Sequence, residues 1–237
     1  MLAMILVGGR GTRLSALHPN VPKALAPVAG RPFLQWQLEW LLRGGVTRAH
    51  LACGHMAAQL VAWAARNPVP GMELTCSEEP FALGTAGGLL FATRFAVEYP
   101  FFAMNGDSLL PNLCFERMAR TFEHGETDAM LAVTGIQKTD RYGTVDVGEN
   151  DRITAFREKT CCARGWINAG VYLLRRSALV AIPENRATSL EPDVFPVLAS
   201  AGRLMAFRAD PPLLDMGTPD GIAAMSEYLS GFEKGKT

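Results

Sequence analysis

A glycine-rich segment near the N-terminus carries the residues best suited to chemistry at a phosphorus atom. Residues 8–14 read Gly-Gly-Arg-Gly-Thr-Arg-Leu, directly after an apolar run, and Pro22 and Lys23 follow. Closely spaced glycines let the backbone approach a ligand and turn its N–H groups inward as an anion nest. Arg13 adds a planar guanidinium that fits phosphate oxygens, and Lys23 adds a compact positive charge. The pattern predicts a site that positions phosphates and neutralises charge during displacement at phosphorus.

Two better-known glycine loops do not fit this segment. Gly9-Arg10-Gly11 is followed by Thr12-Arg13-Leu14, which breaks the dinucleotide pattern G-x-G-x-x-G, and the Walker spacing G-x-x-x-x-G-K-[ST] is missing. Taken alone, the segment fits a structural turn with solvated cations about as well as a ligand site. Other segments of the chain must therefore decide.

Three later segments place polar residues where phosphates or a metal ion would need them. Gly84-Thr85-Ala86-Gly87-Gly88 opens a helix, where backbone N–H groups can lie open to a polar ligand. Asn105-Gly106-Asp107 ends an apolar strand, and Asp215 follows another apolar pair. Carboxylates at strand ends suit Mg²⁺, which prefers oxygen ligands and few protein groups. The two aspartates can meet only if both strands end at the same edge. Thr218 lies closer to the next helix and suits its N-cap better than Asp215 does.

The order of apolar patterns predicts an α/β fold. Short apolar runs alternate with amphipathic stretches, as in βαβ units on a mostly parallel sheet, and an antiparallel lobe follows residue 135. In open α/β sheets ligands bind beyond the carboxyl ends of the strands, where the motifs above are expected. We expect strands at 2–7, 49–52, 73–77, 101–104, 129–133, 142–147, 153–156, 167–174, 204–209 and 213–215, and helices at 33–42, 57–65, 86–95, 113–122, 190–200 and 219–229, within one domain (1–237).

Composition excludes several classes of function. The 237 residues hold 23 basic and 23 acidic side chains, so the chain lacks the positive excess of a nucleic-acid binder. The apolar start at residues 1–7 has no basic region or cleavage site and is too short to span a bilayer. We therefore expect a cytoplasmic protein without nucleic-acid or membrane partners. The five cysteines show no C-x-x-C spacing, which predicts reduced and mostly buried thiols rather than zinc ligands.

The glycine segment with Pro22-Lys23 resembles the signature of the sugar-1-phosphate nucleotidyltransferases. The resemblance runs from Met4 to about Ile222. It implies a Rossmann-like three-layer sandwich with a mixed, mostly parallel sheet and a small antiparallel sugar-binding lobe. It also implies Mg²⁺-dependent transfer of a nucleotidyl group to a sugar 1-phosphate, with release of pyrophosphate. The nucleotide-binding part would span about residues 1–135 and the sugar-binding part about 136–237.

The same resemblance implies roles for individual residues. Arg13 and Lys23 would be catalytic, and Asp107 and Asp215 would hold the metal. The nucleotide would be bound by Val7, Gly8, Gly9, Gly11, Thr12, Glu78, Glu79, Gly84 and Thr85, and the sugar phosphate by Asn105, Tyr142, Gly143, Glu158, Lys159, Asn168 and Gly170.

The acidic pair Glu78-Glu79 bears on the choice of base. Guanine presents adjacent N1–H and N2–H donors, which a carboxylate can accept together. Relatives that use uridine or thymidine triphosphate commonly show glutamine in this stretch, and an amide suits the pyrimidine edge. The pair therefore favours GTP, with uridylyl or thymidylyl transfer as the alternative.

Among guanylyl-transferring relatives, the likeness is greatest to short bacterial enzymes acting on D-glycero-α-D-manno-heptose 1-phosphate. It rests on Asp-Arg-Tyr-Gly-Thr-Val at 140–145, on the run at 167–173 and on the compact length. The product would be a GDP-heptose for capsule, surface-layer or lipopolysaccharide assembly. Mannose 1-phosphate stays open as the substrate, because the two sugars share ring stereochemistry and differ mainly at the exocyclic end.

Two other classes of protein fit the sequence less well. A glycosyltransferase needs no such N-terminal loop and usually pairs its aspartates as Asp-x-Asp, unlike Asp107-Ser108-Leu109. A non-catalytic, nucleotide-sugar-binding regulatory relative would be expected to lose the metal aspartates or Arg13, all of which are present. No hexapeptide repeat follows the last helix, so we expect a single activity. The oligomeric state stays open, and exposed apolar helices would suit a homodimer.

Overall fold

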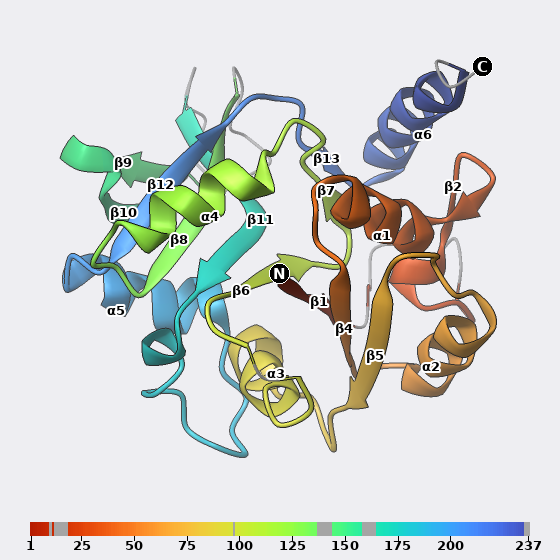
Figure 1. Cartoon of the computed structure of the whole chain (residues 1–237), viewed down its shortest axis with the longest axis horizontal. Coiled ribbons are helices and arrows are strands. Elements are labelled where there is room, and N and C mark those ends of the chain that lie inside the picture. Colours follow the sequence, from red (N-terminus) through yellow and green to blue (C-terminus); the bar gives the residue numbers. More distant parts are fainter. Residues whose placement is uncertain (10, 12–18, 97, 137–143, 158–164, 235–237) are drawn as a thin grey trace.

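A mixed nine-stranded sheet forms the centre of the protein in the computed structural model (Figure 1). The structure describes residues 1–9, 11, 19–96, 98–136, 144–157 and 165–234. Seven strands follow the order β10-β9-β11-β6-β1-β4-β5, while β8 pairs with β11 and β12 pairs with β8. The strands are β1 (Leu2–Val7), β4 (Arg48–Cys53), β5 (Glu73–Glu78), β6 (Phe101–Asn105), β8 (Ala129–Ile136), β9 (Thr144–Val147), β10 (Ile153–Arg157), β11 (Gly165–Leu174) and β12 (Leu204–Ala209).

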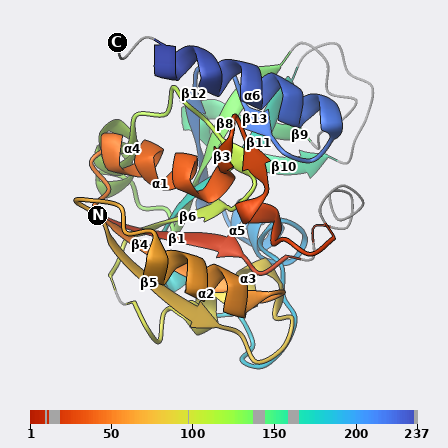
Figure 2. The ribbon, with the colours of Figure 1, turned by 90° about the vertical axis from the view of Figure 1, so that its right-hand side faces the viewer.

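Helices cover both faces of this sheet, and short strands form two further two-stranded sheets. The α-helices are α1 (Phe33–Arg43), α2 (Ala57–Arg66), α3 (Gly84–Ala92), α4 (Phe115–Glu123), α5 (Phe195–Ser200) and α6 (Pro219–Lys234). Three 3₁₀ turns, η1 (Lys23–Leu25), η2 (Glu149–Asp151) and η3 (Arg176–Ala178), and one π-helical turn, η4 (Leu190–Val194), are also present. The short strands form two ribbons, β2 (Pro27–Val28) with β3 (Arg31–Pro32) and β7 (Ser108–Leu109) with β13 (Leu214–Asp215). Helix α6 runs along one end of the molecule, where the chain also ends (Figure 2).

Strand β1 shows why the sheet needs helices on both sides. Ala3, Ile5 and Val7 face a core shared with α1, α2, α4 and α6, while Leu2 and Met4 face a second core shared with α3 and α5. A strand buried on both faces is apolar throughout, rather than alternating, and this matches its sequence. The three-layer α/β sandwich with a mixed, mostly parallel sheet is therefore confirmed.

The order of the strands brings the carboxyl ends of four parallel strands and the first half of one antiparallel strand to the same edge of the sheet. Strands β5, β4, β1 and β6 are parallel neighbours, with Val7 opposite Cys53 and Leu6 opposite Asn105. Their carboxyl ends consequently lie together. Strand β11 runs antiparallel to β6, with Val171 opposite Met104, so its first half lies beside the same edge. The antiparallel strands thus continue the main sheet rather than forming a sheet of their own.

Most expected elements are present, with differences at their ends. Helix α3 begins at Gly84 and ends at Ala92, so it covers 84–92 rather than 86–95. The helix expected at 190–200 is a π-helical turn followed by the six residues of α5, which has a proline in its first turn. Residues 142 and 143 of the expected strand lie outside the described residues. No helix among the described residues is both long enough and apolar enough to cross a membrane.

The cysteines are less buried than the sequence predicts. Cys53 is buried, Cys76 is half-buried on the edge strand β5, and Cys114 is exposed where it precedes α4, all three as free thiols. The expectation of mostly buried thiols is therefore wrong for this part of the chain, because an edge strand and a helix start leave side chains accessible. Cys161 and Cys162 lie outside the described residues.

His50 is a buried titratable group in the central sheet. It is fully buried on β4, and its Nδ1 and Nε2 lie 2.8 Å from Thr75 Oγ1 and Ser77 Oγ, respectively, both on β5. Hydroxyl groups can donate or accept, so they satisfy the neutral imidazole. Burial lowers the pKa of His50 below its usual value of 6.5.

We predict that His50 makes the protein less stable as the pH falls through about 6.5. Below that pH the unfolded chain binds a proton that folded His50 does not, so the free energy of unfolding falls by up to about 1.4 kcal/mol per pH unit until the folded pKa is reached. Urea unfolding at pH 8.0 and at intervals down to 5.5 would measure this slope. His50→Gln should flatten it, whereas His124→Gln, at an exposed position, should leave it in place. An equal slope in His50→Gln would contradict the assignment.

Candidate active site

A cavity of about 450 Å³ opens where β1, β4 and β6 end. Its wall unites the first glycine segment, the start of α3 and the turn after β6. Of the residues predicted to bind ligands, it is lined by Val7, Gly8, Gly9, Gly11, Lys23, Glu79, Gly84, Thr85, Asn105 and Asp107. Glu78 is exposed and is not part of this lining. A second cavity, of about 430 Å³, lies beside Ile182 and Leu198 and includes none of the predicted residues.

Glu79 occupies a space that only glycines leave open. A Cβ atom on Gly54 would lie 2.3 Å from Glu79 Oε1, and one on Gly8 would lie 3.0 Å from it. The other carboxylate oxygen accepts a hydrogen bond from the backbone N–H of Leu83 at 3.2 Å. Burial raises the pKa of Glu79, and the hydrogen bond from Leu83 partly opposes that effect. Glu79 therefore joins the first glycine segment, the end of β4 and the approach to α3.

The start of α3 is closed by a distant segment. The N–H groups of Ala86 and Gly87 donate to the carbonyl oxygen of Thr188 at 2.9 and 3.1 Å. The prediction that N–H groups across this segment lie open to a ligand is therefore wrong for these two residues. A Cβ atom on Gly84, which has a φ of +73°, would lie 2.5 Å from the same oxygen. The glycine is thus needed for close packing of two chain segments, which a single motif in the sequence could not reveal.

The two predicted metal-binding aspartates are brought together by the β7–β13 ribbon. Ser108 pairs with Asp215, and the N–H of Met216 donates to the carbonyl oxygen of Asp107 at 3.0 Å. The two aspartates therefore lie on adjacent segments, although Asp107 lines the cavity and Asp215 is not among its lining residues. Thr218 Oγ1 accepts from the N–H of Gly221 at 3.1 Å, so Thr218 caps the helix as predicted.

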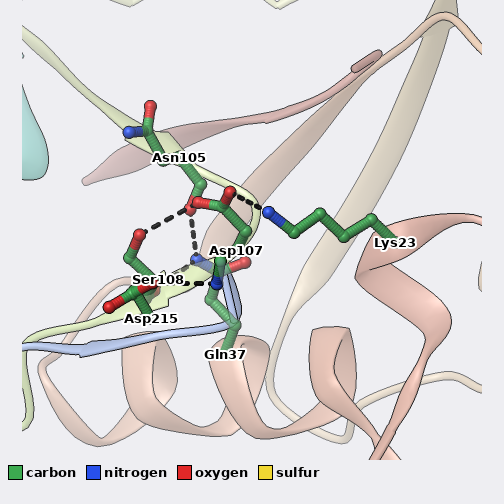
Figure 3. A network of polar contacts seen from close by, with 7 residues as sticks. Lys23, Gln37, Asn105, Asp107, Ser108 and Asp215 are labelled. Carbon is green, nitrogen blue, oxygen red and sulfur yellow. Dashed lines mark hydrogen bonds and ion pairs between the residues drawn. The ribbon is translucent and has the colours of Figure 1, made fainter. Parts of the chain in front are cut away.

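Both carboxylates are held by local hydrogen bonds (Figure 3). Asp107 Oδ1 accepts from Ser108 Oγ at 2.9 Å, and Asp107 Oδ2 accepts from Lys23 Nζ at 2.5 Å. Asp215 Oδ1 accepts from the N–H of Gly217 at 2.8 Å. The catalytic lysine of the sequence prediction thus lies in direct contact with one of the predicted metal ligands. Lys23 and Asp107 together form a charged pair just beyond the carboxyl end of β6.

Asn105 meets strand β11 at a glycine. A Cβ atom on Gly170, which has a φ of +72°, would lie 2.8 Å from Asn105 Nδ2. Asn168 Oδ1 accepts from the N–H of Gly170 at 2.9 Å. The structure therefore brings three predicted sugar-phosphate residues together, of which Asn105 lines the cavity and Asn168 and Gly170 do not.

Glu191 is a residue of the cavity wall that sequence reasoning missed. Its Oε1 accepts from the hydroxyl of Tyr172 at 3.0 Å, and its Oε2 accepts from Thr85 Oγ1 at 3.3 Å. The hydroxyl of Thr85 also accepts from the N–H of Leu190 at 2.7 Å, and Asn168 Nδ2 donates to the hydroxyl of Tyr172 at 3.0 Å. Burial, and then the neighbouring Glu191, raise the pKa of Tyr172 well above 10, so it stays a neutral donor. A polar chain thus links the start of α3 to β11.

The remaining predicted site residues lie outside the described part of the chain. They are Thr12 and Arg13 of the first segment, and Tyr142, Gly143, Glu158 and Lys159 of the predicted sugar-binding part. Their roles stay predictions from the sequence.

Comparison with known proteins identifies a family and several relatives that match nearly the whole chain. The model of the family described as "Nucleotidyl transferase" matches residues 2–230. "Mannose-1-phosphate guanyltransferase beta-B" of Xenopus laevis is 36% identical over 235 residues, which cover 97% of this chain and 65% of that protein. "Probable mannose-1-phosphate guanylyltransferase 2" of Arabidopsis thaliana is 37% identical over 244 residues, covering 99% of this chain and 66% of that protein. The chain thus spans about two thirds of the length of these relatives.

A solved structure is similar over nearly the whole fold. HddC from Yersinia pseudotuberculosis, complexed with GMP-PN, superposes with a TM-score of 0.86 at 25% sequence identity, covering 96% of this chain and 99% of that chain. The short strands and the antiparallel part are therefore included in the likeness. The similarity extends well beyond the motifs around the cavity.

We predict that Glu191 holds the start of α3 against the η4 segment. Loss of a hydrogen bond to a charged acceptor costs about 1.5 kcal/mol or more, which is about tenfold in a local opening equilibrium. In Glu191→Gln, the amide hydrogens of Leu190 and Ala86 should exchange about tenfold faster, while the midpoint of global unfolding changes little. Glu184→Gln, at an exposed position, serves as the matched control. Unchanged protection in Glu191→Gln would refute the link.

Proposed function

This chain belongs to the nucleotidyl transferase family, and on that premise we propose that it transfers a guanylyl group from GTP to a sugar 1-phosphate. The products are a GDP-sugar and pyrophosphate. The observation that carries the proposal is the single cavity in which the glycine segment, Lys23 and Asp107 meet. A nucleotide-binding module alone would not need a lysine in contact with a carboxylate at the place where phosphates would lie.

The reaction is a displacement at the α-phosphorus of the triphosphate. An oxygen of the sugar phosphate forms the new bond to phosphorus, and the bond to the pyrophosphate oxygen breaks. The backbone around Gly9 can approach the phosphates closely, because no atom of the described residues, its chain neighbours aside, lies within 4 Å of the position that its Cβ would take. Lys23 supplies positive charge where negative charge is transferred between reactants. Arg13, as predicted from the sequence, would act on the same charge.

Asp107 and Asp215 fit a Mg²⁺ site by their chemistry and position. No group of three histidine, cysteine, aspartate or glutamate side chains with metal-binding geometry is found among the described residues. Mg²⁺ at a nucleotide site usually needs only one or two carboxylates, with phosphates and water completing the set. Asp107, directly before β7, and Asp215, in the paired strand β13, would supply two carboxylates in this way. When bound, the ion would neutralise phosphate charge and orient the reactants.

Two observations support guanine as the base: the position of Glu79 in the cavity lining and the names of the relatives. Glu79 lines the cavity beside the start of α3, where the base is expected, and a carboxylate can accept both N–H donors of guanine. The two mannose-1-phosphate relatives are named as guanylyl or guanyl transferases, and the HddC structure is complexed with GMP-PN. Uridylyl or thymidylyl transfer is the alternative that the same site could perform.

For the sugar, we propose a manno-configured 1-phosphate. The names of the relatives support mannose 1-phosphate. The sequence resemblance to short bacterial enzymes favours D-glycero-α-D-manno-heptose 1-phosphate. Both sugars present the same ring hydroxyls to residues such as Asn105 and Asn168, and they differ only at the exocyclic end. The described residues of the cavity give no contact that selects between them.

Pyrophosphate release tests the proposal directly. The enzyme would be incubated with Mg²⁺ and with each pair drawn from GTP, ATP, UTP and dTTP and from mannose, glucose and D-glycero-α-D-manno-heptose 1-phosphates. The expected result is release with GTP and a manno-configured sugar. Release with UTP or dTTP alone would overturn the guanylyl assignment. Nucleotide-sugar binding without any release would favour the non-catalytic regulatory relative.

We predict that Asp107→Asn and Asp215→Asn each lower kcat by about a hundredfold or more, because misplaced reactants alone can cost that much. Both variants should retain the far-ultraviolet circular dichroism of the wild type. Asp220→Asn, an exposed acidic residue in the first turn of α6, is the matched control and should retain activity. A normal rate in both site variants would refute the two-carboxylate assignment.

We also predict that Glu79→Gln narrows the preference for GTP, whereas Glu78→Gln does not. Without the carboxylate, an N–H donor of bound guanine has no acceptor, which weakens GTP binding by about 1–3 kcal/mol. That cost corresponds to a loss of roughly tenfold to a hundredfold in the preference for GTP over ATP. The measurement is the ratio of kcat/KM for GTP to that for ATP in each variant. Glu78 is exposed outside the cavity and is therefore the natural control. Equal ratios in the wild type and Glu79→Gln would show that backbone groups read the base.

A further inference from the structure

Helix α1 contains one glutamine in an otherwise apolar buried face. Gln37 is fully buried, between Trp36 and Leu38, which are also buried. Its side chain reaches the turn of residues 105–108, named here the Asp107 turn (Figure 3). Gln37 Nε2 donates to the carbonyl oxygen of Asn105 at 2.8 Å and to that of Ser108 at 3.2 Å. One amide group thus holds both ends of the turn that carries Asp107.

The rest of the Asp107 turn is held by backbone hydrogen bonds. The N–H of Gly106 donates to the carbonyl oxygen of Leu6 at 3.0 Å, and the carbonyl oxygen of Asp107 accepts from Met216 at 3.0 Å. A Cβ atom on Gly106 would lie 2.6 Å from that oxygen of Leu6, so the turn packs directly on β1. Strand β1 and Met216, the residue after β13, therefore fix the middle of the turn, and Gln37 fixes its two ends.

The orientation of the Gln37 amide is determined by its partners. Turning the amide over would point its oxygen at two carbonyl oxygens, which cannot donate. In the observed orientation Oε1 is buried and has no partner among the residues that the structure describes. A buried oxygen without a partner costs its full desolvation, so Gln37 is not the side chain that packing alone would favour. Methionine would fill a similar volume without that cost.

We propose that Gln37 is a positioning residue for Asp107. By holding the ends of the turn, it sets the direction in which the Asp107 carboxylate faces the triphosphate and its cation. The inference rests on the proposed function, in which Asp107 is a cation ligand. It assigns the buried amide a part in cation binding and turnover, in addition to any part in stability.

Gln37→Met tests the proposal, with Gln35→Met as the matched control. Gln35 lies on the same helix but is partly exposed, so the two variants share chemistry and differ in contact with the turn. Mn²⁺ titration in the presence of a non-hydrolysable GTP analogue, followed by electron paramagnetic resonance, measures cation affinity without turnover. We expect half-saturation to require about tenfold more Mn²⁺ in Gln37→Met, as for loss of groups that orient metal ligands. Gln35→Met should match the wild type.

Steady-state kinetics and melting temperature separate positioning from stability. We expect kcat of Gln37→Met to fall about tenfold or more, KM for GTP to stay within about twofold, and the protein to remain folded at the assay temperature. Gln37→Asn keeps an amide but is one methylene too short to reach both carbonyls, so it should show the same cation effect if the methionine variant does not fold. Wild-type Mn²⁺ affinity and kcat in whichever variant folds would overturn the proposal. If the wild type releases no pyrophosphate but Gln37→Met still binds Mn²⁺ about tenfold more weakly, the proposed function is refuted, whereas the cation-binding part of this inference stands.

Discussion

The pairing of β7 with β13 is the contact on which the candidate site depends. It joins two segments that are more than a hundred residues apart, with Ser108 opposite Asp215 and the N–H of Met216 bound to the carbonyl of Asp107. Each strand has only two residues, so the ribbon has little stability of its own. It persists because the buried neighbours Leu109 and Leu214 belong to the core beneath it. The two carboxylates are therefore brought together by core packing, even though each lies near the surface.

The antiparallel course of β11 is the second constraint on the site. A fifth parallel strand would place its own carboxyl end beside β6, whereas β11 places residues 168–170 there instead. This lets one edge of the sheet combine the ends of β1, β4 and β5, where we propose that the nucleotide binds, with the β11 residues proposed to bind the sugar phosphate. The chain from Thr85 through Glu191 to Tyr172 then ties the two halves at the cavity wall. Glu191 contacts both the start of α3 and β11, and so fixes the distance between them.

The sequence predicted the elements with strong patterns and missed contacts between distant segments. Apolar runs such as Leu2–Val7 were placed correctly, because six residues followed by glycines are too few for a buried helix and suit a strand. The glycines and Asp107 of the cavity were identified because they follow apolar strands, and Lys23 was identified through the family signature. Gln37 and Glu191 could not be found in this way, since a single glutamine in a helix or a glutamate after a leucine has no pattern. Thr188 was also missed, because a backbone carbonyl that closes α3 leaves no trace in residue type.

The glycines around Glu79 have a consequence for how this family of sites can change. Gly8 and Gly54 leave room for one carboxylate, and Gly88 approaches its other oxygen, with its Cβ position 3.4 Å away. A Cβ atom at position 54 would meet Glu79 Oε1 at 2.3 Å and also the backbone Cα and carbonyl oxygen of Gly8, both at 2.9 Å, so a shorter residue 79 would remove only the first of these clashes. A shorter residue 79 in turn leaves Leu83 without its acceptor. Positions 8, 54, 79 and 83 therefore constrain one another, and a substitution at one of them changes what the others tolerate.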